Sequence, residues 1–470
     1  MRVSPNYDLV VIGAGSAGLT AASFAARLGA RVALVERHRI GGDCTWTGCV
    51  PSKALLKAAK VAQDMRRAAE FGLPPVYPTI DLKRVMARVR GVIESVYQFE
   101  TPEALGAKGI DVILGAPRFV DPTKISVDGR VIHAKHFIIC TGANPFFPTI
   151  PGLADTPCLT YESIFGLEEL PRRLIVLGAG PVGVELAQAF QRLGSSVTLI
   201  GRPDRILPIA DREASAVLAD QLSADGVRIL TGAEVTKIES RDGALLAFAG
   251  KEECAGDALL VAVGRWPNVG GLELERAEID YTAQGIRVDA HLHTSQRHIY
   301  ACGDVIGSFQ FSHYAGWQGA MAARNALLPG SSRGIRPTVP WVVFTDPEIG
   351  QVGISEKQSR DENMPTKVHR WPLERIDRAQ TEGEHDGFLK LITGPNGRLL
   401  GGTVVASSAG ELINELSLAI EKRLNVSHIA TTIHAYPTYG FGIQQASAEA
   451  VASRLINGWR KRLLSVLVRR

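Results

Sequence analysis

One glycine fingerprint occurs twice in this 470-residue chain and limits the folds that the chain can adopt. In the first copy, residues 13–18 read Gly-Ala-Gly-Ser-Ala-Gly between an apolar stretch and a predicted helix, and Glu36 ends the next apolar stretch. Such glycines permit a tight turn, the approach of a pyrophosphate to a helix N-terminus and close helix–strand packing, while the acid accepts ribose hydroxyls. The pattern therefore predicts a Rossmann-like βαβ unit that binds a dinucleotide.

The second copy aligns with the first without a gap but differs at the position of the acid. Glu36 aligns with Gly201, which is followed by Arg202 and Arg205. Because no acid accepts the ribose hydroxyls and arginines suit a 2′-phosphate, this site is predicted to bind NADPH. Gly183 is more usual for NADH, which stays the alternative. The matching glycines are Gly13, Gly15 and Gly18 in the first copy and Gly178, Gly180 and Gly183 in the second.

Cys44 and Cys49 lie close together in a glycine-rich stretch, residues 41–53. Pro51 is favoured at the first position of a helix, so Cys49 is expected near a helix N-terminus, where the dipole favours a thiolate. The turn that carries Cys44 can fold back to disulfide distance. A disulfide that closes so small a loop adds little stability, so the pair is expected to open and close. Two unrelated core cysteines are the alternative.

The composition is ordinary for a soluble globular protein, with 45% hydrophobic and 21% charged residues and a net charge of +4. The mild charge argues against a nucleic-acid partner. We find no signal peptide and no apolar run of the ~18 residues that span a membrane, so a cytoplasmic protein without stable membrane association is expected. The basic residues 459–470 are expected to form a packed or frayed helix, with a membrane-surface helix as the alternative.

The predicted fold class is α/β, with two Rossmann-like dinucleotide-binding domains and a C-terminal α+β domain. A proline cluster near residue 150 and the segment 264–268 indicate the boundaries. The predicted segments are 1–150, 151–268, 269–335, which returns to the first domain, and 336–470. The more local predictions are a helical stretch at 81–106 with Asp81 as N-cap, strands at 131–139 and 299–305, Cys302 in the core, and a helix at 409–422.

Taken together, these motifs resemble those of the FAD-dependent class I pyridine nucleotide–disulfide oxidoreductases, which include dihydrolipoamide dehydrogenase, glutathione reductase and mercuric reductase. The resemblance extends from Tyr7 to about Glu449. The motifs that carry it, besides the two fingerprints, are Gly42-Asp43-Cys44, Cys49-Val50-Pro51-Ser52-Lys53, Thr141-Gly142, Glu185, Gly264-Arg265, Pro267-Asn268 and Cys302-Gly303-Asp304.

The resemblance implies two cofactors, a redox centre and a homodimer. Cys49 is the thiol nearest the flavin, Cys44 meets the substrate, and Lys53 pairs with Glu185 beside the flavin. The final domain builds the homodimer and carries its tail to the partner's active site. The residues implied at the FAD site are Gly13, Gly15, Gly18, Glu36, Gly42, Asp43, Lys53, Ala116, Thr141, Gly142 and Asp304. Those implied at the NADPH or NADH site are Gly178, Gly180, Gly183, Arg202, Gly264 and Arg265.

The tail of the chain departs from the thiol-specific members of this family. Tyr436 stands where they carry the histidine that acts as acid and base, and Phe441 stands where they carry its glutamate. His434 comes two residues too early; on a strand it would point the same way as Tyr436. Tyrosine, with a pKa near ~10, is a poor base at neutral pH. Ordinary thiol–disulfide turnover is therefore not favoured.

Mercuric reductase is similar at this position, where it carries a tyrosine, although it ends in a Cys-Cys pair and no cysteine follows Cys302 here. We therefore expect a catalytic role for Tyr436 and reduction of a soft metal ion such as Hg(II). Cys44 and Cys49 would serve as its transient ligands. Dihydrolipoamide dehydrogenase or another disulfide reductase is one alternative, and a non-catalytic flavoprotein subunit is another.

Overall fold

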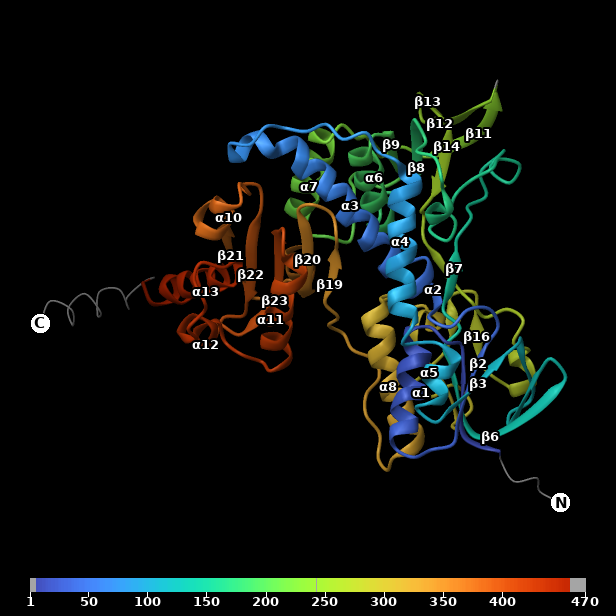
Figure 1. Ribbon diagram of the computed structural model, residues 1–470. Coiled ribbons are helices and arrows are strands. Elements are labelled where there is room, and N and C mark those ends of the chain that lie inside the picture. Colours follow the sequence, from blue (N-terminus) through green and yellow to red (C-terminus); the bar gives the residue numbers. More distant parts are fainter. Residues whose placement is uncertain (1–5, 242, 457–470) are drawn as a thin grey trace, which may run out of the picture. The chain divides into compact units, whose positions relative to one another are not determined.

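The computed structural model describes residues 6–241 and 243–456, so the helix expected at 459–470 lies outside the described residues. The chain divides into two compact units (Figure 1). The first unit comprises Met1–Ala58, Thr79–Gly178 and Thr236–Arg336, and the second comprises Ala59–Pro78, Ala179–Val235 and Pro337–Arg470. The predicted four-part division at residues 150, 268 and 335 stays a prediction.

A sheet of seven strands forms the centre of the first unit. Its parallel part runs β3, β2, β1, β6 and β18, and β5 and β4 extend β6 in antiparallel fashion. The strands are β1 (Tyr7–Ile12), β2 (Val32–Glu36), β3 (Ile110–Leu114), β4 (Pro117–Asp121), β5 (Lys124–Val127), β6 (Arg130–Ile139) and β18 (Ile299–Ala301).

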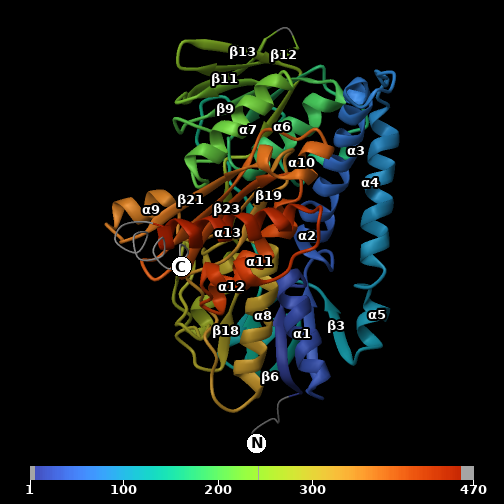
Figure 2. The same cartoon turned by 90° about the vertical axis from the view of Figure 1, so that its left-hand side faces the viewer.

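Both faces of this parallel sheet are buried, which explains why its strands read as continuous apolar runs. Successive residues of a strand point to opposite faces. Leu9 and Val11 of β1 therefore join one core with α1 (Ser16–Arg27) and α8 (Ser312–Leu327), while Val10 and Ile12 join a second core on the other face. The helices α1 and α8 lie side by side (Figures 1 and 2).

Smaller elements complete the first unit. The expected helical stretch at 81–106 is two helices, because a turn at residues 98–101 separates them, and Asp81 caps the first as predicted by accepting from Arg84 N over 3.2 Å. These elements are α2 (Gly42–Trp46), α3 (Cys49–Arg67), which continues into the second unit, α4 (Leu82–Tyr97), α5 (Pro102–Gly106), β7 (Ala143–Pro145), β8 (Arg173–Leu177), β11 (Val235–Arg241), β12 (Ala244–Ala249), β13 (Glu252–Gly256), β14 (Ala258–Val261), β15 (Arg265–Pro267), β16 (Tyr281–Thr282) and β17 (Gly285–Ile286).

The second unit contains the rest of the second glycine fingerprint and an antiparallel sheet of five strands in the order β19, β20, β23, β22 and β21 (Figure 1). The expected helix at 409–422 is confirmed as α11. The elements are α6 (Pro181–Leu193), β9 (Ser196–Gly201), α7 (Arg212–Ala224), β10 (Arg228–Thr231), β19 (Trp341–Val343), β20 (Glu348–Gly353), α9 (Glu356–Asp361), β21 (Lys367–Pro372), α10 (Asp377–Thr381), β22 (Phe388–Thr393), β23 (Leu399–Ala406), α11 (Ala409–Glu421), α12 (Val426–Thr431) and α13 (Tyr439–Ile456).

These elements confirm the α/β class, with two glycine-fingerprint βαβ sequences and a C-terminal α+β part. The expected strand at 299–305 is shorter than predicted: β18 ends at Ala301 and a 3-10 turn follows at Gly303–Ile306. Cys302 lies in the core as predicted. Among the described helices, none combines the length and the apolar character needed to cross a membrane.

Candidate functional site

The first glycine fingerprint forms the predicted turn between β1 and α1. Gly13 has a φ of +100°, and a Cβ there would lie 2.5 Å from the carbonyl oxygen of Cys140. A Cβ on Gly18 would lie only 1.8 Å from the oxygen of Gly13. Gly15, by contrast, has its nearest neighbour 3.9 Å away, and it precedes the first residue of α1. The turn therefore fits a pyrophosphate that approaches the helix N-terminus.

Glu36 ends β2 as predicted, and its carboxylate faces the glycine turn. Its Oε2 accepts from the backbone N–H of Ala14 and its Oε1 from that of His38, each over 2.8 Å. The N–H of Gly115 donates to the backbone oxygen of Glu36 over 2.9 Å, which brings the exposed Ala116 to the same edge. The acid is thus fixed where the ribose of FAD is expected.

Cys44 and Cys49 are neighbours in the folded chain, and neither forms a disulfide in this structure. Cys49 is the first residue of α3, where unpaired N–H groups stabilise negative charge. A hydrogen bond with Cys49, together with burial, raises the pKa of Cys44. These features disfavour a thiolate on Cys44 and favour one on Cys49. The roles predicted for the two residues agree with this difference.

The local structure around the cysteines differs from the prediction in two ways. The helix begins at Cys49 and not at Pro51, and Cys44 lies in the short helix α2 and not in an open turn. Gly41, with a φ of +106°, starts α2, and the N–H of Gly48 donates to the oxygen of Asp43 over 2.5 Å. Glycines with positive φ thus produce a tight helical turn where the sequence suggested only a bend.

Ser312 is a site residue that the sequence did not reveal. Its Oγ lies 3.2 Å from the Sγ of Cys49, and it is the first residue of α8. The hydroxyls of Ser312 and Ser16 oppose the rise in the pKa of Cys44. The only available signal was a serine at the start of a helical pattern, which ordinarily indicates a cap.

Asp43, Arg265 and Asp304 come from three distant segments and meet in one cluster. The guanidinium of Arg265 donates to the carboxylate of Asp304 over 2.5 Å, to the carboxylate of Asp43, and to the hydroxyl of Tyr161 over 3.2 Å. Burial raises the pKa of Asp304, and Arg265 opposes that rise. Arg265, expected at the nicotinamide site, is therefore bound to two residues expected at the FAD site. The sequence analysis did not predict that Tyr161 belongs to this cluster.

Thr141 and Gly142 are held against the segment that contains Gly264. The hydroxyl of Thr141 donates to the backbone oxygen of Asn268 over 2.8 Å, and the N–H of Asn268 donates to the oxygen of Gly142 over 2.9 Å. The strands β7 and β15 pair just beyond these contacts. Two motifs far apart in the sequence are thereby placed side by side.

The second fingerprint repeats the turn but not the acid. A Cβ on Gly178 would lie 2.3 Å from the oxygen of Ala262, so this glycine is required as Gly13 is. A Cβ on Gly201 would lie 2.7 Å from the Cβ of Ala179, which leaves no room for an acid there. Arg202 is exposed, whereas the guanidinium of Arg205 donates to the backbone oxygen of Pro208 over 2.7 Å. Arg202 is therefore the more exposed of the two arginines, and Arg205 is tied to the backbone.

Lys53 and Glu185 fall in different units, and their pairing stays a prediction. Lys53 Nζ donates to the hydroxyl of Ser52 over 3.3 Å. Glu185 is buried on α6, where its carboxylate accepts from the N–H of Phe344 over 2.9 Å. This hydrogen bond holds the Glu185 carboxylate against the backbone of the second unit.

A buried ion-pair network holds the same helix α6 in place. Arg192 donates to the carboxylates of Asp225 and Asp346, each over 2.7 Å, and Lys60 also contacts Asp346 over 2.7 Å. Gln188 accepts from the N–H of Asp346 over 2.7 Å. Opposite charges balance in this network, as buried ion pairs require. The sequence motif around Asp346 gave no sign of this role.

The segment of Tyr436 and His434 is a loop and not a strand, so the condition under which the two side chains would point the same way is not met. The two residues contact different partners. The hydroxyl of Tyr436, 63% exposed, donates to Asp377 over 2.7 Å. His434 Nε2 lies 2.9 Å from Glu415, and its Nδ1 lies 2.9 Å from the oxygen of Thr432. Phe441 packs edge-on against Tyr436.

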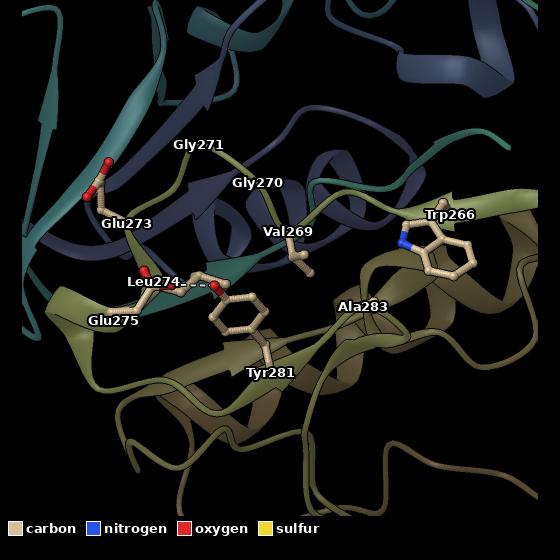
Figure 3. Close-up of a pocket in the computed structure, with 9 residues that line it drawn as sticks. All are labelled: Trp266, Val269, Gly270, Gly271, Glu273, Leu274, Glu275, Tyr281 and Ala283. Atoms are coloured by element: carbon tan, nitrogen blue, oxygen red, sulfur yellow. Dashed lines mark hydrogen bonds between the residues drawn. The ribbon is translucent and has the colours of Figure 1, made fainter. Parts of the chain in front are cut away.

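A pocket in the first unit contains none of the predicted site residues (Figure 3). Trp266 and the residues around Tyr281 line it, and the hydroxyl of Tyr281 donates to Glu275. No cluster of three His, Cys, Asp or Glu side chains within residues 6–241 and 243–456 could hold a metal ion.

Comparison with known proteins shows the family. Residues 7–320 match the pyridine nucleotide-disulphide oxidoreductase model, and residues 339–447 match the dimerisation domain of that family. A dihydrolipoyl dehydrogenase of Thermus scotoductus is 38% identical over 96% of this chain and 98% of its own length. A mercuric reductase of Bacillus cereus is 34% identical over 94% of this chain and 71% of its own length.

Solved structures agree with the sequence relatives. The HOCl-induced flavoprotein disulfide reductase RclA from Escherichia coli superposes with a TM-score of 0.85 at 31% identity, over 94% of this chain and 99% of that one. LpdA from Mycobacterium tuberculosis superposes with a TM-score of 0.87 at 30% identity, and the match again covers 94% of this chain and 99% of that one. This chain therefore belongs to the pyridine nucleotide-disulphide oxidoreductases, the NAD(P)H-dependent enzymes that carry FAD.

Proposed function

We propose that this protein uses NADPH to reduce a soft metal ion such as Hg(II) at the Cys44–Cys49 pair. The observation that carries the proposal is the tail, where Tyr436 stands in the position of a catalytic histidine. Its hydroxyl donates to Asp377, and this hydrogen bond raises the pKa of Tyr436 above its ordinary value. A phenol in this state is a poor base at neutral pH.

His434 does not replace the missing base in the described conformation. Its Nδ1 contacts a backbone carbonyl and must carry a proton to do so, and its Nε2 contacts the carboxylate of Glu415. The hydrogen bond with Glu415 raises the pKa of His434, although its burial has the opposite effect. Both nitrogens are occupied, so neither is ready to protonate a leaving thiol.

A metal ion needs no such base. Two neighbouring thiolates are good ligands for a soft cation, and the start of α3 favours a thiolate on Cys49. Bound FAD supplies the transfer of two electrons between NADPH and the thiol pair. Lys53 and Glu185 are proposed to balance charge beside it, while Tyr436 helps to bind the metal.

Two relatives support a metal substrate. The Bacillus cereus relative is a mercuric reductase. The Escherichia coli protein RclA is described as a Cu(II) complex in one of its structures. A disulfide substrate is the second candidate, because the Thermus scotoductus relative is a dihydrolipoyl dehydrogenase and because His434 and Glu415 form a histidine–carboxylate pair in the same tail.

We further propose that the protein acts as a homodimer in the cytoplasm. The match of residues 339–447 to a dimerisation domain supports the homodimer. Exposed apolar side chains in this region, Leu418 at 58% and Ile433 at 94% exposure, suit a surface that a second copy covers. Measuring the mass in solution at micromolar concentration tests this, and an active monomer would contradict it.

The test of the substrate is steady-state turnover with a panel of acceptors. NADPH oxidation is measured with Hg(II), Cu(II) and glutathione disulfide, and dihydrolipoamide is measured with NAD. Wild type is compared with Tyr436→His and with Tyr77→His, a control at a 77% exposed tyrosine of the same unit. We expect wild type to reduce Hg(II) and to be weak with both disulfide couples.

Tyr436→His is expected to raise disulfide turnover by at least about tenfold, since a positioned base contributes ~10²–10⁴. Tyr77→His should change nothing. Fast dihydrolipoamide turnover by wild type that is lost in His434→Ala would favour the second candidate. Absence of Hg(II) reduction at every concentration would contradict the metal substrate.

A further inference from the structure

Cys140 and Cys302 form a second close pair of sulfur atoms in the first unit. Cys140 follows β6 and Cys302 follows β18, and these parallel neighbours pair Ile139 with Ala301. The ladder continues for one more residue, because the N–H of Cys302 donates to the oxygen of Ile139 over 3.1 Å. The two Sγ atoms lie 3.5 Å apart, and both residues are free thiols.

The strands already hold the two residues at disulfide spacing. Neighbouring strands lie about 4.8 Å apart, and disulfides bridge Cα atoms that are about 4.4–6.8 Å apart. The sulfur atoms of Cys140 and Cys302 are at contact distance and need to approach to about 2.0 Å to form a bond. That approach requires side-chain rotation and an adjustment of the strand ends.

The surroundings of this pair differ from those of Cys44 and Cys49. Cys302 is fully buried and Cys140 is 6% exposed, within an apolar cluster that includes Ala14. Burial raises the pKa of Cys140 far above its ordinary value. Since the thiolate is the reactive form, the buried pair must react more slowly than Cys49, which lies at a helix N-terminus.

The position of the pair gives a bond there a structural effect on the FAD site. A Cβ on Gly13 would meet the backbone oxygen of Cys140 at 2.5 Å, so the glycine turn packs directly on this residue. Cys302 immediately precedes Gly303 and Asp304. A covalent bond would therefore join the strand end beneath the glycine turn to the strand end that leads to Asp304.

We propose that Cys140 and Cys302 are a second dithiol, which two-electron oxidants close into a disulfide between β6 and β18. With an azo oxidant such as diamide, both S–H bonds break and one S–S bond forms. The two hydrogens and two electrons pass to the N=N bond, which becomes a hydrazine. Cys44 and Cys49 cycle during turnover, whereas this pair closes under oxidant and reopens with a dithiol reductant.

The test uses the holoprotein of the double variant Cys44→Ser/Cys49→Ser, in which the Cys44–Cys49 disulfide cannot form. Samples are taken at intervals during diamide treatment, alkylated in denaturant, digested without reduction and examined by mass spectrometry. We expect a linked peptide containing Cys140 and Cys302, lighter by two hydrogens, that disappears with dithiothreitol. It should form at least about tenfold more slowly than the Cys44–Cys49 bond of wild type.

Two matched variants serve as controls. Cys302→Ala must abolish the link and leave Cys140 fully alkylated, whereas Cys254→Ala, at another buried cysteine, must leave the link unchanged. If the double variant does not fold, wild type is used, since the two linked peptides differ in mass. The proposal is overturned if Cys140 and Cys302 stay fully alkylated long after Cys44–Cys49 has closed. A link from Cys140 to Cys158 would also overturn it.

Discussion

The two glycine fingerprints build the same turn and then differ at the end of the second strand. Gly13 and Gly178 would each place a Cβ within 2.5 Å of a carbonyl oxygen, so both turns depend on glycine in the same way. The first copy then presents the carboxylate of Glu36 to its turn, while the second has Gly201 packed against Ala179. The shared residues define the fold of the turn, and we expect the residue that differs to determine which ribose each copy accepts.

The largest effect is expected where glycine is required by backbone contact. In Gly18→Ala a Cβ would lie 1.8 Å from the oxygen of Gly13, so the turn between β1 and α1 must open. We expect a loss of about 3 kcal/mol in the free energy of unfolding and loss of bound FAD. Thermal unfolding and the flavin released on denaturation measure both.

Gly91→Ala is the control for this variant. Gly91 lies inside α4 with no atom within 4 Å of a Cβ, so alanine should stabilise the protein by about 0.5–1 kcal/mol. If both variants had the same stability and flavin content, close packing would not explain Gly18.

The next largest effect is expected at Glu36, the acid that the first copy has and the second copy lacks. Glu36→Gln keeps the shape of the side chain but removes its charge. We expect FAD affinity to fall by roughly tenfold to a hundredfold, equivalent to about 1.5–3 kcal/mol for a charged hydrogen bond, with NADPH affinity unchanged. Titration of the apoprotein with FAD measures the first, and titration with NADPH the second. An equal loss for both nucleotides would show that Glu36 serves the fold and not the ribose.

The glycine turn and the residues that follow it could be predicted because they are local in the sequence. Gly18, Glu36 and Asp81 each contact residues of the same βαβ unit or the same helix turn, and all three lie as predicted. Periodicity also located α11 to within one residue. A local sequence pattern is therefore enough to predict a residue's position when the residue contacts its own sequence neighbours.

The contacts that the sequence did not reveal join residues far apart in the chain. Arg265 reaches Asp43, Ser312 reaches Cys49, and Arg192 reaches Asp346 only after folding. Each residue type is common at helix ends or on surfaces, so nothing local distinguishes it. The sequence also did not predict that α3 starts at Cys49. The chain enters this region through the short helix α2, whose N-cap is Gly41 in a left-handed conformation, and the sequence pattern did not indicate that helix.

A smaller effect is expected from the arginines of the second copy. Arg202 is exposed, whereas Arg205 donates to a backbone carbonyl. We expect Arg202→Glu to raise the KM for NADPH by about tenfold while NADH is unaffected, since an arginine–phosphate contact contributes ~1.5–3 kcal/mol. Arg205→Glu should mainly lower the unfolding temperature. The reverse pattern would show that Arg205 leaves its backbone partner to meet the nucleotide.

The smallest effect is expected at the middle glycine of each fingerprint. Gly15 and Gly180 both have a φ of −83°, which alanine adopts freely. A Cβ on Gly15 would be 3.9 Å from its nearest neighbour, and one on Gly180 would have none within 4 Å. Folding therefore does not require glycine at either position, and the space there is left for the pyrophosphate.

Gly15→Ala and Gly180→Ala should accordingly leave the unfolding free energy within about 0.5 kcal/mol of wild type. Each variant should lower the affinity for its own nucleotide only, FAD or NADPH, by roughly fivefold. The reason is that the added methyl group would crowd the pyrophosphate, at a cost of about 1 kcal/mol in binding free energy. Calorimetric titration of both variants with both nucleotides gives the four values needed. If Gly180→Ala bound NADPH as tightly as wild type while Gly15→Ala lost FAD affinity, the second turn would hold its nucleotide in a different way from the first.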